Sequence, residues 1–308
     1  MKNENKPAVV TPKELHSLMN QSKDLALIDT LPEDHFVKRH LPGARNACVY
    51  QVVFPAQVES IVQDRKHQVV LYGSSGRSLA AITAAEKLDR LGYEHVSVLS
   101  GGLKAWVEAG YPLEGQDPDG ADETEGIHIE ERTYRIDTGQ SIIEWAGRNV
   151  NTKHFGTLRL SRGEVVVSNG EIKGSFDVDM GSIKNISLEG DPLQGVLIAH
   201  LLSDDFFFVD RFPHATFTID SARWSDERTL TYPNLHIDGT LDLHGVKKPI
   251  SFSATLGMLA DGAIAAEAHF DIDRTEWGIL YGSSRYFEHL GMHLVFDLIS
   301  IQLRIVAR

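Results

Sequence analysis

Residues 172–180 read Ile-Lys-Gly-Ser-Phe-Asp-Val-Asp-Met, a stretch in which apolar and polar side chains alternate. Because successive side chains of a strand point to opposite faces, Phe176 and Val178 share one face, and Asp177 and Asp179 share the other. A strand with one apolar face is typical of an antiparallel sheet that covers a core on one side. The same period of two recurs at 215–219, 235–243, 250–256, 270–272 and 299–305. So many successive strands predict a closed antiparallel barrel or a sandwich for the second half of the chain.

One helix is expected to interrupt these strands, at residues 191–201. Asp191 can cap its N-terminus, and Pro192 suits its first turn. Helical spacing then places five side chains on one face: Leu193, Val196, Leu197, His200 and Leu201. A helix of this kind can plug one end of a barrel.

The first half of the chain alternates helix and strand signals. Residues 11–14 read Thr-Pro-Lys-Glu, the pattern of a capping box, which predicts a short helix through about Met19. The apolar runs at 25–28 and 68–72 predict short buried strands. Residues 78–91 carry helical spacing at Leu79, Ile82, Ala85 and Leu88. Strands that alternate with helices predict an α/β domain with a parallel sheet.

An acidic segment separates the two halves. Residues 117–131 carry seven acidic and no basic side chains, together with Gly and Pro, so they should stay solvated. A chain of 308 residues also exceeds the usual size of a single core. We therefore expect one domain at 8–116, a linker at 117–131 and a second domain at 132–308.

The composition excludes several classes of protein. A formal net charge of -13 argues against binding to a nucleic-acid backbone. No run approaches the roughly 20 apolar residues of a membrane-spanning helix, and residues 1–15 lack the apolar run of a signal peptide. Cys48 is the only cysteine, which excludes an internal disulfide and a multi-cysteine metal site. These features predict a cytoplasmic protein with no membrane span that binds no nucleic acid.

Signals for enzymes, metals and cofactors are also missing. The sequence has no phosphate loop, dinucleotide fingerprint or nucleophile-elbow serine in a suitable context. His236 with His244, and His289 with His293, have even spacings, but no HExxH motif or clustered tract accompanies them. We therefore expect neither a metal nor a cofactor.

Five motifs in the first half resemble the rhodanese family, in the family's order and spacing over about residues 8–116. They are Leu27-Ile-Asp29, His40-Leu-Pro-Gly-Ala44, Tyr72-Gly-Ser-Ser-Gly-Arg-Ser78, Gly101-Gly102 with Trp106, and Gly110-Tyr-Pro112. The resemblance implies a small α/β domain. In active members a cysteine follows the strand, and loop amides with a helix N-terminus stabilise its thiolate or persulfide.

That cysteine is missing here. Gly73 stands at its position, the loop is one residue shorter than usual, and Leu31 replaces an arginine that many members carry. We therefore expect no sulfurtransferase activity, and a small buried apolar role for Cys48.

Three interpretations of the degenerate loop are open. It is a structural relic or docking module without chemistry, or a weak anion site, or a site with Ser74 or Ser75 as nucleophile, which lacks a histidine base within sequence reach. The residues of the possible anion site are Gly73, Ser74, Ser75, Gly76, Arg77 and Ser78.

From Tyr134 onward the chain resembles the YceI-like family of polyisoprenoid-binding domains with a lipocalin-like barrel. The motifs are Tyr134-Arg-Ile-Asp137 with Ser141-Ile-Ile-Glu-Trp145, Leu202-Ser-Asp-Asp-Phe-Phe207 with Arg211-Phe-Pro-His-Ala-Thr-Phe217, Gly239-Thr-Leu-Asp-Leu-His-Gly-Val-Lys-Lys-Pro249, and Arg274-Thr-Glu-Trp-Gly-Ile279. The resemblance implies an eight-stranded antiparallel barrel whose apolar interior holds a long-chain lipid or isoprenoid amphiphile. The resemblance also implies a possible homodimer that forms through the barrel; the residues themselves do not indicate it.

The strand register gives candidate residues for that interior. Alternation alone does not separate a cavity from a packed core, because eight strands are only just wide enough to enclose a ligand. For a polar head group, Arg148, His154 or the cationic pair Lys247 and Lys248 are candidate partners, although solvated surface charge is the commoner role of such side chains. The expected apolar cavity residues are Trp145, Phe176, Phe217, Ile237, Leu241, Phe252, Phe270 and Trp277.

Two functions remain open on the sequence alone. The first is non-catalytic binding of a long-chain apolar or isoprenoid ligand in the barrel, with the inactive rhodanese-like module docking or sensing. The alternative is a partner-docking or anion-sensing protein whose barrel is a packed scaffold.

Overall fold

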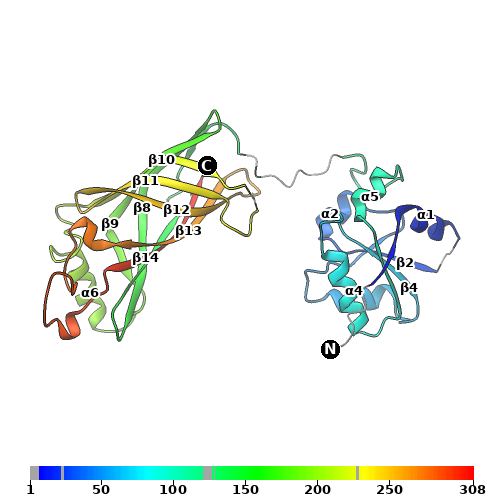
Figure 1. The fold of residues 1–308 in the computed structure, drawn as a ribbon, viewed down its shortest axis with the longest axis horizontal. Helices are drawn as coiled ribbons and strands as arrows, with labels where there is room; N and C mark the ends of the chain where they lie inside the picture. The colour runs from blue at the N-terminus through cyan, green and yellow to red at the C-terminus, as the bar shows by residue number, and fades with distance from the viewer. Residues whose placement is uncertain (1–6, 22–23, 121–126, 128, 227–228) are drawn as a thin grey trace. The chain divides into compact units, whose positions relative to one another are not determined.

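A computed structural model describes residues 7–21, 24–120, 127, 129–226 and 229–308. The chain divides into two compact units, Met1–Glu123 and Thr124–Arg308 (Figure 1). The N-terminal unit mixes helices with strands, and the C-terminal unit is built mainly from long strands.

The N-terminal unit is an α/β domain around a five-stranded sheet in the order β1-β5-β4-β2-β3. Every pair in it is parallel, as the sequence predicts. One apolar cluster includes Phe54 and Leu88, and a second includes Leu15 and Trp106. The elements are β1 (Ala8–Val10), α1 (Pro12–Gln21), β2 (Leu25–Asp29), α2 (Glu33–Lys38), β3 (Arg45–Asn46), α3 (Phe54–Ile61), β4 (Gln68–Tyr72), α4 (Ala80–Arg90), β5 (His95–Leu99) and α5 (Gly102–Glu108).

The capping box at the start of α1 is confirmed. The Thr11 amide donates to Glu14 Oε2 over 2.8 Å, and the Glu14 amide donates to Thr11 Oγ1 over 3.3 Å. These reciprocal bonds satisfy amides that the first helical turn leaves without partners. The hydrogen bond from the Thr11 amide, and then that from its hydroxyl, hold the pKa of Glu14 below its usual value.

The buried face of α4 differs from the predicted one. Leu79 precedes the helix and is 68% exposed, and Ile82 is 39% exposed. The helix instead buries a face of small side chains and one leucine: Ala80, Ala81, Ala84, Ala85 and Leu88. An alanine face lets a helix approach a sheet closely, and alanine carries too little hydrophobicity to show this in a sequence pattern.

The C-terminal unit is a closed antiparallel barrel of eight strands, β7 to β14, so the predicted fold is confirmed. Neighbouring strands pair in sequence order from β9 to β14, then β14 pairs with β7, β7 with β8, and β8 with β9 closes the ring. The short strand β6 adds to β8. The strands are β6 (Thr133–Arg135), β7 (Ile142–Arg148), β8 (Lys153–Ser168), β9 (Glu171–Asn185), β10 (His214–Trp224), β11 (Leu235–Leu243), β12 (Val246–Met258), β13 (Ile264–Asp273) and β14 (Leu298–Ala307).

The first and last strands of this unit meet at a seam. The Arg135 amide donates to the Arg308 carbonyl over 2.7 Å, and the Arg308 amide returns a bond of 2.8 Å. Ile136 forms a bridge to Ala307 beside them.

One helix, α6 (Leu193–Leu202), lies between β9 and β10 and sits at one end of the barrel (Figure 1). The Leu193 amide donates to Asp191 Oδ1 over 2.8 Å, as the cap prediction requires. The predicted single apolar face is wrong in part, because Leu193 and Val196 are 61% and 64% exposed. Leu197 and Leu201 pack toward the barrel core.

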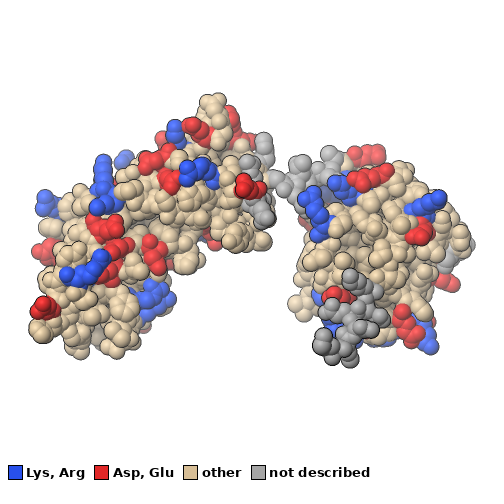
Figure 2. Space-filling model, viewed as in Figure 1, with Lys and Arg blue, Asp and Glu red and all other residues tan. Residues whose placement is uncertain are grey.

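The outer surface of the barrel carries paired charges. Acidic and basic side chains are interspersed on the face shown in Figure 2. Arg223 lies 2.7 Å from Asp238, and the Ser251 hydroxyl donates to the same carboxylate over 2.6 Å. The Ser251 bond, and then the Arg223 charge, lower the pKa of Asp238. Across the described residues, no helix is long and apolar enough to cross a membrane.

Candidate functional site

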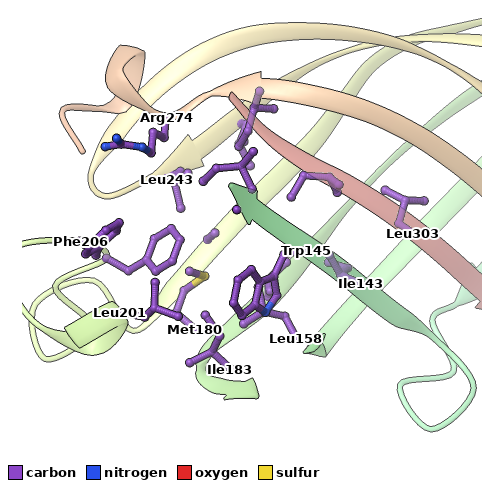
Figure 3. A pocket seen from close by; sticks show the side chains of 18 of the residues that line it. Ile143, Trp145, Leu158, Met180, Ile183, Leu201, Phe206, Leu243, Arg274 and Leu303 are labelled. Carbon is purple, nitrogen blue, oxygen red and sulfur yellow. The ribbon is translucent and has the colours of Figure 1, made fainter. Parts of the chain in front are cut away.

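The barrel encloses a cavity of about 190 Å³ beneath α6. Figure 3 shows Trp145, Met180, Leu201 and Phe206 converging on this space. An apolar cavity of about 150 Å³ in another protein is dry and admits benzene, so a space of this size has room for part of an apolar ligand. A chain that enters here would exchange water for aliphatic and aromatic contacts.

The inward positions of the strands form the wall of this cavity. Register pairs Phe217 with Phe176 on one side and with Leu241 on the other, so these three side chains point inward together. Trp145 pairs with Ile301 across β7 and β14 in the same way. Its indole Nε1 donates to the Lys184 carbonyl over 3.2 Å, which satisfies the one polar atom of that ring.

The α6 end of the cavity is closed by side chains from the helix and the loop that follows it. Leu197 and Leu201 of α6, with Phe206 and Phe207 after it, all line the space. The His200 ring meets Tyr281 edge to face at 4.5 Å, so α6 contacts the loop between β13 and β14.

A buried cation, Arg274, supports the cavity wall. It is 0% exposed, and its guanidinium donates to three carbonyls: Ile279 over 2.6 Å, Val295 over 3.1 Å and Phe296 over 3.2 Å. Burial lowers the pKa of Arg274, and the nearby Asp297 carboxylate opposes that shift. Because backbone oxygens take up these donors, Arg274 holds the two ends of the segment between β13 and β14 together rather than offering a charge to a ligand.

The polar residues that line the cavity lie mainly at the β7–β8 turn. Arg148, Asn149 and His154 line the space there. Arg148 Nη1 donates to Ser300 Oγ over 2.7 Å, and His154 Nδ1 lies 3.3 Å from Ser187 Oγ.

A second, smaller cavity of about 60 Å³ lies further along the barrel interior. Ile237 lines this one and not the larger cavity. Trp277 lines neither: it is 2% exposed, and its Nε1 donates to the Leu241 carbonyl over 3.1 Å. Lys247 and Lys248 also lie outside both cavity walls.

The loop after β4 in the N-terminal unit carries hydroxyls but no thiol. The Gly73 carbonyl accepts from the Leu103 amide and the Ser74 carbonyl from the Lys104 amide, each over 2.9 Å, which ties the loop to α5. The hydroxyls of Ser75 and Ser78 accept from the amides of Arg77 and Ala80, each over 3.3 Å. Gly76 lies between them. The lone thiol, Cys48, is outside this loop and only 3% exposed.

A buried carboxyl group lies close to this loop, at the end of β2. Asp29 is 0% exposed; its Oδ1 accepts from the Leu31 amide over 2.7 Å, and its Oδ2 is buried without a hydrogen-bond partner. Burial raises the pKa of Asp29 to about 6, against the smaller opposing effect of the Leu31 amide. This group therefore titrates near neutral pH.

Two family models match the chain. Residues 134–307, more than half of the sequence, match the YceI-like domain. The chain belongs to the YceI-like domain family. Residues 11–109 match the rhodanese-like domain, so the N-terminal unit of this YceI-like protein is a rhodanese-like domain.

Solved structures resemble each unit. BcnA of Burkholderia cenocepacia is 15% identical over 56% of this chain and 99% of its own, with a TM-score of 0.45. A polyisoprenoid binding domain from Saccharophagus degradans is 16% identical over 57% of this chain and 97% of its own, with a TM-score of 0.40. A thiosulfate sulfurtransferase from Pseudomonas aeruginosa is 31% identical over 35% of this chain and 20% of its own, with a TM-score of 0.32. No curated protein sequence matches the chain.

The structure brings six of the eight candidate residues to the larger cavity of the YceI-like barrel. These six are Trp145, Phe176, Phe217, Leu241, Phe252 and Phe270. Phe206, Phe207 and Arg274 also line the cavity, although they follow a helix or a strand rather than belonging to an alternating run. The run of three phenylalanines at 206–208 favours, on the sequence alone, a core position under the helix rather than a ligand contact.

Proposed function

We propose that the YceI-like barrel binds and carries a long-chain apolar ligand of the fatty or isoprenoid class. The observation that supports this most directly is the cavity of about 190 Å³ beneath α6, whose wall is apolar. Burying a methylene in such a space is favourable by about 0.8 kcal/mol, so even a short alkyl chain offsets a substantial ordering cost. The family resemblance makes isoprenoids the first probes.

Filling the cavity should weaken ligand binding. Ala215 lines the cavity and is 4% exposed, whereas Thr218 on the same strand is exposed. Ala215→Phe places a ring in the ligand's space, and we expect it to weaken binding of geranylgeraniol at least about tenfold, since the loss of two buried methylenes alone exceeds this. Titration of the intrinsic tryptophan fluorescence, to which Trp145 in the cavity wall contributes, measures the affinity.

Thr218→Phe is the matched control, because it adds the same ring on the outer face. It should bind as the unchanged protein does. Equal binding by the Ala215→Phe variant would show that the ligand sits elsewhere. A lack of uptake by the unchanged protein, together with no apolar compound released on organic extraction, would favour the scaffold and partner-docking alternative.

The rhodanese-like unit is, in this proposal, a docking or sensing module without sulfur chemistry. A thiolate is needed to carry sulfur, and reactive thiols are partly exposed in electropositive surroundings. Gly73 offers no thiol, and the Cys48 side chain is buried. Substrate access to Cys48 would require the domain to open.

The purified protein should therefore transfer no sulfur from thiosulfate to cyanide. Thiocyanate formation by the full chain, compared with that of the Cys48→Ala variant, is the measurement. Both rates should equal the rate without protein. Thiocyanate formation that disappears in the variant would assign a sulfur carrier to Cys48 and contradict this part of the proposal.

A further inference from the structure

Two cavities in the barrel share part of their walls. The larger, of about 190 Å³, and the smaller, of about 60 Å³, are both lined by Phe176, Phe217, Phe252 and Leu303. A ligand chain that occupies the larger cavity must pass these side chains to reach the smaller one.

The three phenylalanines among them, together with Phe270 of the larger cavity, form a continuous row across the interior. The ring centroids of Phe176 and Phe217 lie 5.4 Å apart, those of Phe217 and Phe252 lie 5.5 Å apart, and Phe252 stacks on Phe270 at 4.2 Å with an interplanar angle of 11°. These four side chains, called the phenylalanine row below, come from β9, β10, β12 and β13. The row is therefore anchored on four different strands.

The backbone makes a place for the central ring of this row. Gly239 occupies an inward position of β11 between Ile237 and Leu241, where every other inward residue carries a side chain. A Cβ on Gly239 would overlap Cζ of the Phe217 ring. A glycine inside a strand often marks a site where another group approaches the backbone closely. Phe217 thus fills the space that Gly239 leaves, and its side chain lines both cavities.

We propose that the phenylalanine row sets the longest chain that the barrel accepts, and that the smaller cavity is a closed extension of the ligand site. This inference rests on the proposed function. Chains that stop short of the row fit the larger cavity, and longer ones must leave carbons outside or displace the Phe217 ring.

This arrangement predicts a break in the dependence of affinity on chain length. Each methylene that enters the cavity raises affinity about fourfold. Once the chain reaches the row, further methylenes stay in water or in the mouth, so affinity levels off. Phe217→Ala joins the two cavities, and the break should move to a longer chain, with a gain of about fifteenfold for two additional buried methylenes.

The experiment measures the affinity of the full-length protein for straight-chain primary alcohols from octanol to eicosanol. The unchanged protein, Phe217→Ala, Ile237→Ala and the double variant are compared. Ile237 lines only the smaller cavity, so Ile237→Ala alone should leave the break in place. In the double variant the break should move beyond that of Phe217→Ala, because the opened extension is then larger.

The outcomes separate this inference from the proposed function. Binding with a break at the same chain length in the unchanged protein and in Phe217→Ala overturns the inference and leaves the proposed function standing. A shift caused by Ile237→Ala alone also overturns it, since the two cavities would already be connected. If no alcohol binds to the unchanged protein, the proposed function fails and the inference fails with it. Circular dichroism checks the fold, and Phe217→Leu, which shortens the side chain less, replaces Phe217→Ala if that variant does not fold.

Discussion

Arg274→Met should lower the free energy of unfolding of the barrel by about 3–5 kcal/mol. The substitution keeps an apolar stem of similar length but removes the donors that the carbonyls of Ile279, Val295 and Phe296 now use. Buried carbonyls without partners cost about 1–3 kcal/mol each when the surroundings cannot rearrange. The loop that follows β13 would lose its attachment, and with it part of the cavity wall.

Arg285→Met is the control, because both arginines lie against Asp297. Arg285 is half exposed at the surface, so its replacement should lower the free energy of unfolding far less than that of Arg274 does. Urea unfolding of the full chain, followed by fluorescence in a Trp106→Phe background, reports on the barrel through its own tryptophans. If the two variants lose the same free energy of unfolding, Arg274 contributes no more than a surface ion pair, which contradicts this prediction.

Asp29→Asn should stabilise the rhodanese-like unit by about 2–3 kcal/mol at pH 8, and by much less at pH 4. Because burial raises the pKa of Asp29 to about 6 from its usual value of 3.8, the folded unit holds this proton more tightly than the unfolded chain does. Its stability therefore falls as pH rises from about 4 to about 6, and the cost remains above that interval. Asparagine removes the charge and keeps an oxygen that accepts from the Leu31 amide.

Asp64→Asn is the matched control for this prediction. Its Oδ1 accepts from the Lys66 amide over 2.9 Å, the same bond that Asp29 makes, but at an exposed position. Fluorine NMR of the full chain labelled with fluorotryptophan gives Trp106 a separate signal, so urea unfolding of this unit can be followed at each pH. A stabilisation by Asp29→Asn that does not change between pH 4 and pH 8 would contradict the assignment.

The carboxylates on the barrel surface have the opposite effect on the pH dependence of stability. The pKa of Asp238 and of Asp261 is lowered, mainly by the hydrogen bonds that Ser251 and Arg308 donate to them. Carboxylates of this kind stabilise the fold at neutral pH, and their contribution is lost as pH falls through the folded-state pKa. Acidification should therefore destabilise the barrel, whereas protonation of Asp29 should stabilise the rhodanese-like unit.

The fold was predictable because side-chain alternation is a direct consequence of strand geometry. Phe176, Phe217 and Leu241 were assigned inward from their positions alone, and strand pairing brings them together. The α4 register was not predictable in the same way. Its buried face is mostly alanine, so Leu79 and Ile82 dominated the pattern although both are exposed.

The cavity itself was beyond the reach of periodicity. Whether inward side chains fill a barrel or leave a space depends on how their volumes match the strands they face. Trp277 is an example. It is a large aromatic residue of the kind that lines apolar cavities, but the hydrogen bond from its indole to the Leu241 carbonyl holds it in the packed region. Gly239 shows the reverse, since a position without a side chain determines where the Phe217 ring can lie.

The seam between Arg135 and Arg308 can form only after the last strand, β14, has been synthesised. The barrel's first strands leave the ribosome long before β14, yet β7 has no partner on one side until β14 arrives. Contacts of such large sequence separation form late and slowly. Nascent chains that end before β14 should therefore expose the apolar interior of the barrel, while the preceding domain, whose last sheet strand is β5, can already be folded.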